Sequence, residues 1–176
     1  MNLKQFEGIS LLGRISYAIM CMEIYLTSIH PDRDWRPLFK ILWSICNEET
    51  YWDEWASEVL EVVPEYLFEF PSFEESDFRY LDEESYRAMK SLLSDHDAGT
   101  DILIEGILDM EEAYSYTEIT RVGEESLRIL QSITDVLEDA GIPLPDPQEV
   151  AFSSFEELEG RGNSFDYRLL SKILQS

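Results

Sequence analysis

Residues 9–29 read ISLLGRISYAIMCMEIYLTSI, and this stretch determines which class of fold the chain adopts. Its apolar residues recur at alternating intervals of three and four, which is the period of an α-helix with one continuous buried stripe. The stripe consists of Leu12, Ile15, Ile19, Met22, Leu26 and Ile29. Two charged residues, Arg14 and Glu23, lie within the stretch, and Pro31 follows it. We therefore predict a long buried helix that ends before Pro31, and no membrane span.

The helical period continues through the rest of the chain, and an alternation of period two is almost absent. Further helices are predicted near residues 34–45, 50–63, 82–94, 100–114 and 124–140. We predict an all-α fold, in which about six to seven helices form a bundle around the long first helix. The bundle is one domain covering residues 1–176, with an irregular connector at residues 142–165 before a short C-terminal helix.

The composition restricts the class of partner. The chain of 176 residues carries a formal net charge of −24, and 44% of its residues are hydrophobic. So many apolar residues are typical of a folded domain and not of a disordered acidic tail. The charge argues against binding to nucleic acid or to an anionic membrane surface, because both require basic residues. We expect a basic partner, and self-repulsion between equally charged copies favours a monomer.

Motifs for catalysis or metal binding are absent from the sequence. The two cysteines, Cys21 and Cys46, lie among apolar helical residues and are interpreted as buried free thiols. The two histidines, His30 and His96, lack the spacing of a zinc pair or of a di-iron bundle. We expect no cofactor and no enzymatic activity. The N-terminus lacks the order of a signal peptide, which predicts a cytoplasmic protein.

Two series of carboxylates are arranged at helical spacing. The first consists of Glu54, Glu58, Glu61, Glu65 and Glu69. The second consists of Asp101, Glu105, Asp109 and Glu112. If the helix that begins near residue 50 continues through Pro64, the first series lies on one face. Like charges four residues apart each cost a helix about 0.2–0.5 kcal/mol, and no basic residues are interleaved to reduce this cost.

These series have two interpretations. They form either a solvated face that increases solubility, or a docking surface for a basic protein. Aromatic residues near the acidic ones favour docking, because tyrosine and tryptophan are common at interface hot spots, although they also suit a loop anchored to the core. Besides the two series, the predicted partner-binding residues are Tyr51, Phe73, Glu74, Glu75 and Asp77.

Residues 34–43, DWRPLFKILW, follow the long first helix with the pattern Asp-Trp-x-Pro-Leu-x-x-x-Leu-Trp. With the helix order and the acidic charge, this pattern resembles the all-α immunity proteins of bacterial polymorphic toxin systems over about residues 3–130. The resemblance implies a protein without cofactor or enzymatic activity that binds a cognate toxin domain, commonly a basic nuclease, and neutralises it. It identifies no individual contact residue.

Two other functions remain open. A helical interaction or scaffold module would bind another partner, and a binding surface within residues 1–46 would favour it, because that segment carries five basic and four acidic residues. A carboxylate-dependent metalloenzyme is the third hypothesis, and it is the least favoured of the three because 37 acidic residues make any carboxylate pair uninformative.

Overall fold

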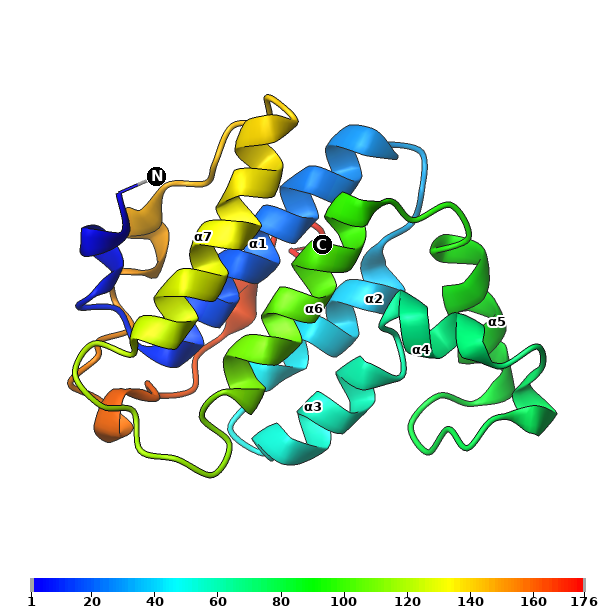
Figure 1. Ribbon diagram of the computed structural model, residues 1–176, viewed down its shortest axis with the longest axis horizontal. Coiled ribbons are helices and arrows are strands. Elements are labelled where there is room, and N and C mark those ends of the chain that lie inside the picture. The colour runs from blue at the N-terminus through cyan, green and yellow to red at the C-terminus, as the bar shows by residue number, and fades with distance from the viewer. Residues whose placement is uncertain (1, 176) are drawn as a thin grey trace.

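The first helix, α1, lies at the centre of the structure, a computed structural model that describes residues 2–175 (Figure 1). Within these residues the chain forms seven α-helices and no β-strand, which confirms the all-α prediction. The helices are α1 (Leu11–Ile29), α2 (Arg36–Trp43), α3 (Trp52–Leu60), α4 (Pro64–Glu69), α5 (Glu83–Leu92), α6 (Ala98–Glu112) and α7 (Glu124–Asp139).

The position of α1 follows from its sequence. The Ser10 side chain caps its N-terminus by accepting a hydrogen bond from the Gly13 amide at 3.0 Å. Fifteen of its 19 residues are buried, because α6 and α7 pack on one side and α2 packs on another. A helix that is apolar over most of its circumference is stable only when neighbouring elements cover it. The predicted long buried first helix is therefore confirmed.

The layer formed by α6 and α7 determines which helix faces point outward. Gly106 of α6 lies against Ile133 of α7, and a Cβ atom at Gly106 would be 3.0 Å from the Ile133 Cδ1. The absence of a side chain at this position allows the two helices to approach closely. The α3 helix packs against another side of α6 (Figure 1). The exposed surfaces of α3 and α6 therefore lie next to each other.

A buried cation connects three segments of the fold. The guanidinium of Arg14 donates to the backbone carbonyls of Phe6, Val122 and Gly123 at 3.1, 2.7 and 3.1 Å. It also donates to the Ser126 hydroxyl at 2.8 Å. Burial lowers the pKa of Arg14 to about 10. No ion pair to Arg14 occurs within residues 2–175, so neutral oxygens replace the water that the cation loses.

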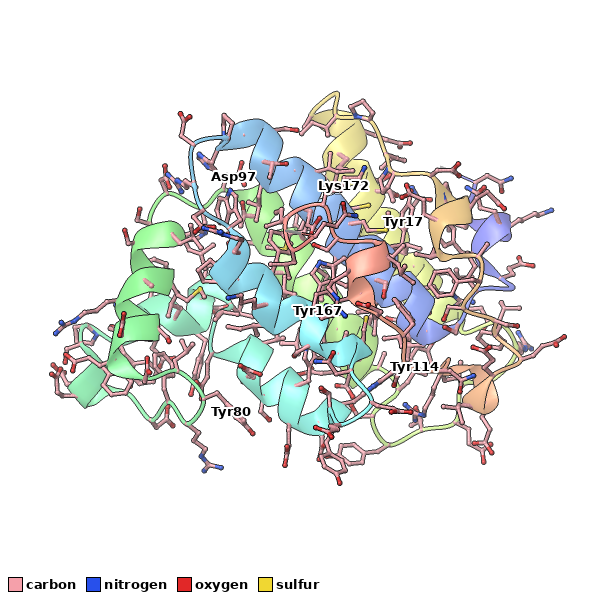
Figure 2. The ribbon with its side chains drawn as sticks, turned by 180° about the vertical axis from the view of Figure 1, so that it is seen from behind. Tyr17, Tyr80, Asp97, Tyr114, Tyr167 and Lys172 are labelled. Atoms are coloured by element: carbon pink, nitrogen blue, oxygen red, sulfur yellow. The ribbon has the colours of Figure 1, made fainter. Side chains whose placement is uncertain are left out.

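The C-terminal segment, residues 142–175, contains turns of 3-10 helix and no α-helix. The predicted short C-terminal helix is therefore wrong, and only the 3-10 turn Tyr167–Leu169 forms there. The physical reason is that this part of the chain follows the surface of α1 and α2, as Figure 2 shows for Tyr167 and Lys172. The Tyr167 ring stacks on Trp43 at 6.2 Å between ring centroids.

A second buried charge, Glu23 of α1, holds this segment in place. Its carboxylate accepts hydrogen bonds from the Ser171 hydroxyl at 2.5 Å and from the Lys172 amide at 2.9 Å. The indole of Trp43 donates to the same carboxylate at 2.7 Å. Burial raises the pKa of Glu23, and these donors act in the opposite direction by stabilising its ionised form.

The Arg14→Met substitution should destabilise the fold by about 3 kcal/mol, because it removes the donors of several buried carbonyl groups and keeps the apolar bulk. Urea denaturation followed by circular dichroism measures this change. The control is Arg128→Met, since Arg128 is exposed and forms its ion pair with Glu125 of the same helix. We expect the control to leave the unfolding midpoint almost unchanged. Equal midpoints for both variants would contradict a central role for Arg14.

Candidate partner-binding site

Exposed carboxylates gather on the joined surfaces of α3, α4 and α6. We define the acidic face as the set Asp53, Glu65, Glu105, Asp109 and Glu112. The charges are close enough to affect one another, because Glu65 contributes to the raised pKa of Glu105, after the larger effect of burial. None of these five residues forms an ion pair within the described part of the chain. The structure thus joins members of both predicted series.

The first predicted series is interrupted because α3 ends at Leu60 and α4 begins at Pro64. Glu61, between the two helices, is buried and accepts hydrogen bonds from the backbone amides of Arg79, Tyr80 and Leu81 at 2.6, 3.0 and 2.8 Å. Its carboxylate therefore anchors the loop and is unavailable to a partner. The placement of Glu61 in a partner-binding surface was wrong, because a helix continuing through Pro64 was assumed.

Besides Glu61, four members of the two series are not part of the acidic face. Glu54 is exposed but lies about 100° around α3 from Asp53, away from the groove, and it stays a prediction. Asp101 is next to the face, because its charge contributes to the raised pKa of Glu105.

Glu58 is half-buried, and its pKa is raised by burial and by the neighbouring Glu61. Glu69 is exposed at the end of α4. Asp101 is half-buried and lies 2.6 Å from the Nδ1 of His96. These three residues remain predictions as partner contacts, and only Asp101 is already paired.

The loop between α4 and α5 uses its aromatic residues for packing. Phe73 is half-buried against Tyr86, with 5.8 Å between ring centroids. Glu74, Glu75 and Asp77 are all exposed, and Asp77 accepts a hydrogen bond from the Tyr66 hydroxyl at 2.7 Å. Figure 2 shows Tyr80 of this loop and Tyr114 at the end of α6 on different parts of the molecule. The loop therefore extends away from the end of α6.

A groove of about 340 Å³ lies between α3 and the end of α6. The α3 side consists of Asp53, Ala56, Ser57 and Leu60, and the α6 side consists of Glu111, Glu112, Ser115 and Tyr116. Tyr116 is 93% exposed, and Leu60 is 40% exposed. Tyr51, at the start of α3, is also exposed, at 71%. A concave surface with exposed aromatic and apolar groups beside unpaired carboxylates suits a polar partner side chain with an apolar stem.

Glu111 lines this groove although the residue is only 2% exposed. Its two carboxylate oxygens lie 2.9 and 3.0 Å from a single donor, the Ser115 hydroxyl of the next helical turn. A hydroxyl carries one proton, so one oxygen always lacks a strong hydrogen bond. Burial raises the pKa of Glu111, and the charges of Glu112 and Asp53 act in the same direction. Glu111 is therefore a buried carboxylate with an incomplete set of donors.

Three residues that line the groove, Asp53, Glu111 and Tyr116, are not among the partner-binding residues predicted from the sequence. A signal for Glu111 was present, because it follows Ile104 and Leu108 at helical spacing and so lies on an apolar face. Glu112, one position later, points to solvent. Asp53 belongs to neither acidic series, and nothing in the sequence distinguishes Tyr116 from the other tyrosines.

The structure gives less support to metal binding or to catalysis by a cysteine thiol. Residues 2–175 contain no group of three or more histidine, cysteine, aspartate or glutamate side chains arranged to hold a metal ion. Burial raises the pKa of both thiols, that of Cys46 to about 12, so neither is an activated nucleophile. A wider hollow of about 820 Å³ lies between residues 46–50 and 164–168, where Arg168 already pairs with Asp166.

Comparison with known proteins gives no relative from which functional residues could be assigned to this chain. No protein-family model, no curated protein and no solved structure matches this chain. Among the described residues, no helix has the length and apolar character needed to cross a membrane. The geometry of the acidic face and of the groove is therefore the guide to function.

Glu111→Gln should stabilise the folded protein at neutral pH. The pKa of Glu111 is raised on folding above the value of about 4.3 for an unfolded glutamate, so its ionisation opposes folding as the pH rises above this value. Below about pH 4 the carboxyl is protonated in both states, and the gain should disappear. Thermal unfolding of the wild type and the variant between pH 4 and 8 measures the effect.

The neighbouring variant Glu112→Gln is the control, because Glu112 is exposed on the same turn. It should change the unfolding temperature less than Glu111→Gln at every pH. A loss of stability in Glu111→Gln at pH 7 would contradict the incomplete donor set of Glu111.

Proposed function

We propose that this protein is an immunity protein that binds and neutralises a cognate basic toxin domain, and that this toxin domain is a nuclease. One observation carries the proposal: the five carboxylates of the acidic face are exposed, two of them line a groove, and none forms an ion pair in the described chain. A nuclease presents basic residues to nucleic acid. An acidic protein surface that covers those residues would block access of the substrate.

The distribution of basic residues supports this proposal. Elsewhere on the surface, several arginines pair with nearby acids, as Arg33 does with Asp95 and Arg36 with Asp34. Such pairs cancel charge locally, whereas the acidic face keeps its field. A field of one sign accelerates encounter with an oppositely charged partner and disfavours partners of like charge. These are the properties that an inhibitor of a cationic toxin requires.

A helical interaction or scaffold module is the second candidate. The C-terminal segment exposes the apolar side chains Phe152, Leu158 and Leu169. A partner recognised through these residues would bind mainly by burial of apolar surface, and its affinity would depend little on salt.

The first experiment is capture from a lysate of the source organism at low salt, followed by elution with rising salt and identification by mass spectrometry. Each basic protein eluted in near-equal amount is then produced alone in a host cell. The proposal requires that at least one such protein arrests growth and that co-expression of this chain restores growth. If no captured protein is toxic, or if toxicity persists on co-expression, the proposal is wrong.

With that toxin in hand, the double variant Glu105→Lys and Glu112→Lys should slow association about tenfold and reduce its dependence on salt. Surface plasmon resonance over a series of salt concentrations measures both quantities. The matched control, Glu149→Lys with Glu156→Lys, makes the same change in net charge on the exposed C-terminal segment. Equal slowing by both variants would indicate an effect of total charge and would remove the acidic face from the mechanism.

A further inference from the structure

The three buried carboxylates within residues 2–175 differ in how many hydrogen-bond donors their charge receives. Glu23 receives donors from the Trp43 indole, the Ser171 hydroxyl and the Lys172 amide. Glu61 receives backbone amides of the loop that follows α4. Glu111 receives only the Ser115 hydroxyl, and it lines the groove between α3 and α6. Two of these groups hold the fold together, and the third has capacity for a further donor.

We propose that the groove between α3 and α6 binds one arginine side chain of the cationic partner, with the guanidinium donating to the carboxylate of Glu111. This inference rests on the proposed function, because the arginine belongs to the protein that the acidic face attracts. The inference adds a specific binding site for one arginine of the partner, here called the arginine seat, to the general attraction between the charged surfaces.

The shape of the groove suits this side chain. Ala56 and the half-exposed Leu60 provide apolar contacts for the aliphatic stem, which arginine buries while its charged end stays hydrated or paired. Asp53 and Glu112 add negative charge on opposite sides of the groove. Tyr116 presents an exposed ring, on which a guanidinium plane stacks favourably. A volume of about 340 Å³ is at the lower limit of ligand pockets, as expected for a single side chain.

The protein's own cations do not fill this seat. Arg161 is the one cation whose charge acts on the pKa of Glu111. Its guanidinium donates to the backbone carbonyls of Tyr114 and Thr117 at 2.7 and 3.3 Å, and it lies over the Trp52 ring. No ion pair between Arg161 and Glu111 forms within 4.0 Å in the described chain. Arg161 therefore supports the loop after α6 and leaves Glu111 open.

The energetics of Glu111 agree with a binding role. A buried carboxylate that lacks donors weakens the fold, and groups of this kind are common at sites where binding repays the cost. An arriving guanidinium supplies several N–H donors in one plane and matches both carboxylate oxygens. The same residue is thus unfavourable in the free protein and favourable in the complex.

The test uses the full-length protein labelled with ¹⁵N and a small probe, N-acetyl-arginine-N′-methylamide, titrated at low salt and followed by NMR. The isosteric citrulline compound, which lacks the charge, is the control ligand. We expect saturable shifts of the amides of Ser57 and of residues 111–116 with the arginine probe only. Glu111→Gln should weaken this binding about tenfold, the value of one charge-assisted hydrogen bond.

The matched control variant is Glu105→Gln, which removes a charge from the acidic face outside the groove and should weaken probe binding less than twofold. Since Glu111→Gln is expected to be more stable than the wild type at neutral pH, loss of binding there is not loss of folding. Equal weakening by both variants, or equal binding of arginine and citrulline, would overturn the arginine seat.

The outcomes also separate this inference from the proposed function. If Glu111→Gln binds the toxin as tightly as the wild type while the lysine variants of Glu105 and Glu112 bind slowly, the arginine seat is wrong and the inhibitor function stands. If no toxin is found but the arginine probe binds at Glu111 as expected, the groove stands as a guanidinium site and the inhibitor function is wrong.

Discussion

The burial of α1 over most of its length is the constraint on which the other elements depend. A helix with 15 of 19 residues buried must have neighbours around most of its circumference, and α2, α6 and α7 supply them. Enclosure also forces every polar group on α1 to find a partner inside the protein, since water is excluded. Arg14 meets this requirement with backbone carbonyls of the segments that precede α1 and α7, and Glu23 meets it with the C-terminal segment. The irregular end of the chain is therefore held by charges of the first helix.

The same enclosure explains how charge is distributed. The N-terminal part of the chain is nearly neutral because most of it is covered, and the middle of the chain carries the acidic excess because α3 and α6 expose one side each. Packing of α6 on α7 at Gly106 directs the remaining surface of α6 toward solvent and α3. The acidic face is thus a consequence of which helix sides the core uses. Its field extends over a groove in which Glu111 is only partly satisfied.

Helices were easier to predict from the sequence than the environment of individual carboxylates, for physical reasons. The helices were predictable because period and proline positions are local, and Ser10, Asp82 and Asp97 cap their helices with their own side chains. The burial of Glu61 and Glu111 was not predictable, because the helical spacing of a carboxylate does not distinguish contact with solvent from contact with a distant segment of the chain. Glu61 meets the amides of residues 79–81, and Glu111 meets the flank of α3.

The sequence by itself determined the all-α class, the central first helix and the excess of negative charge, since each depends on composition or on contacts within a few residues. The tertiary structure decided that members of the two acidic series lie on adjacent helices, that Glu61 is withdrawn from the surface, and that the C-terminal segment forms no α-helix. It also decided that Glu111 faces a groove. The physical reason is that burial and hydrogen-bond partners are set by residues far away in the chain, such as Ser171 for Glu23, and no local pattern encodes them.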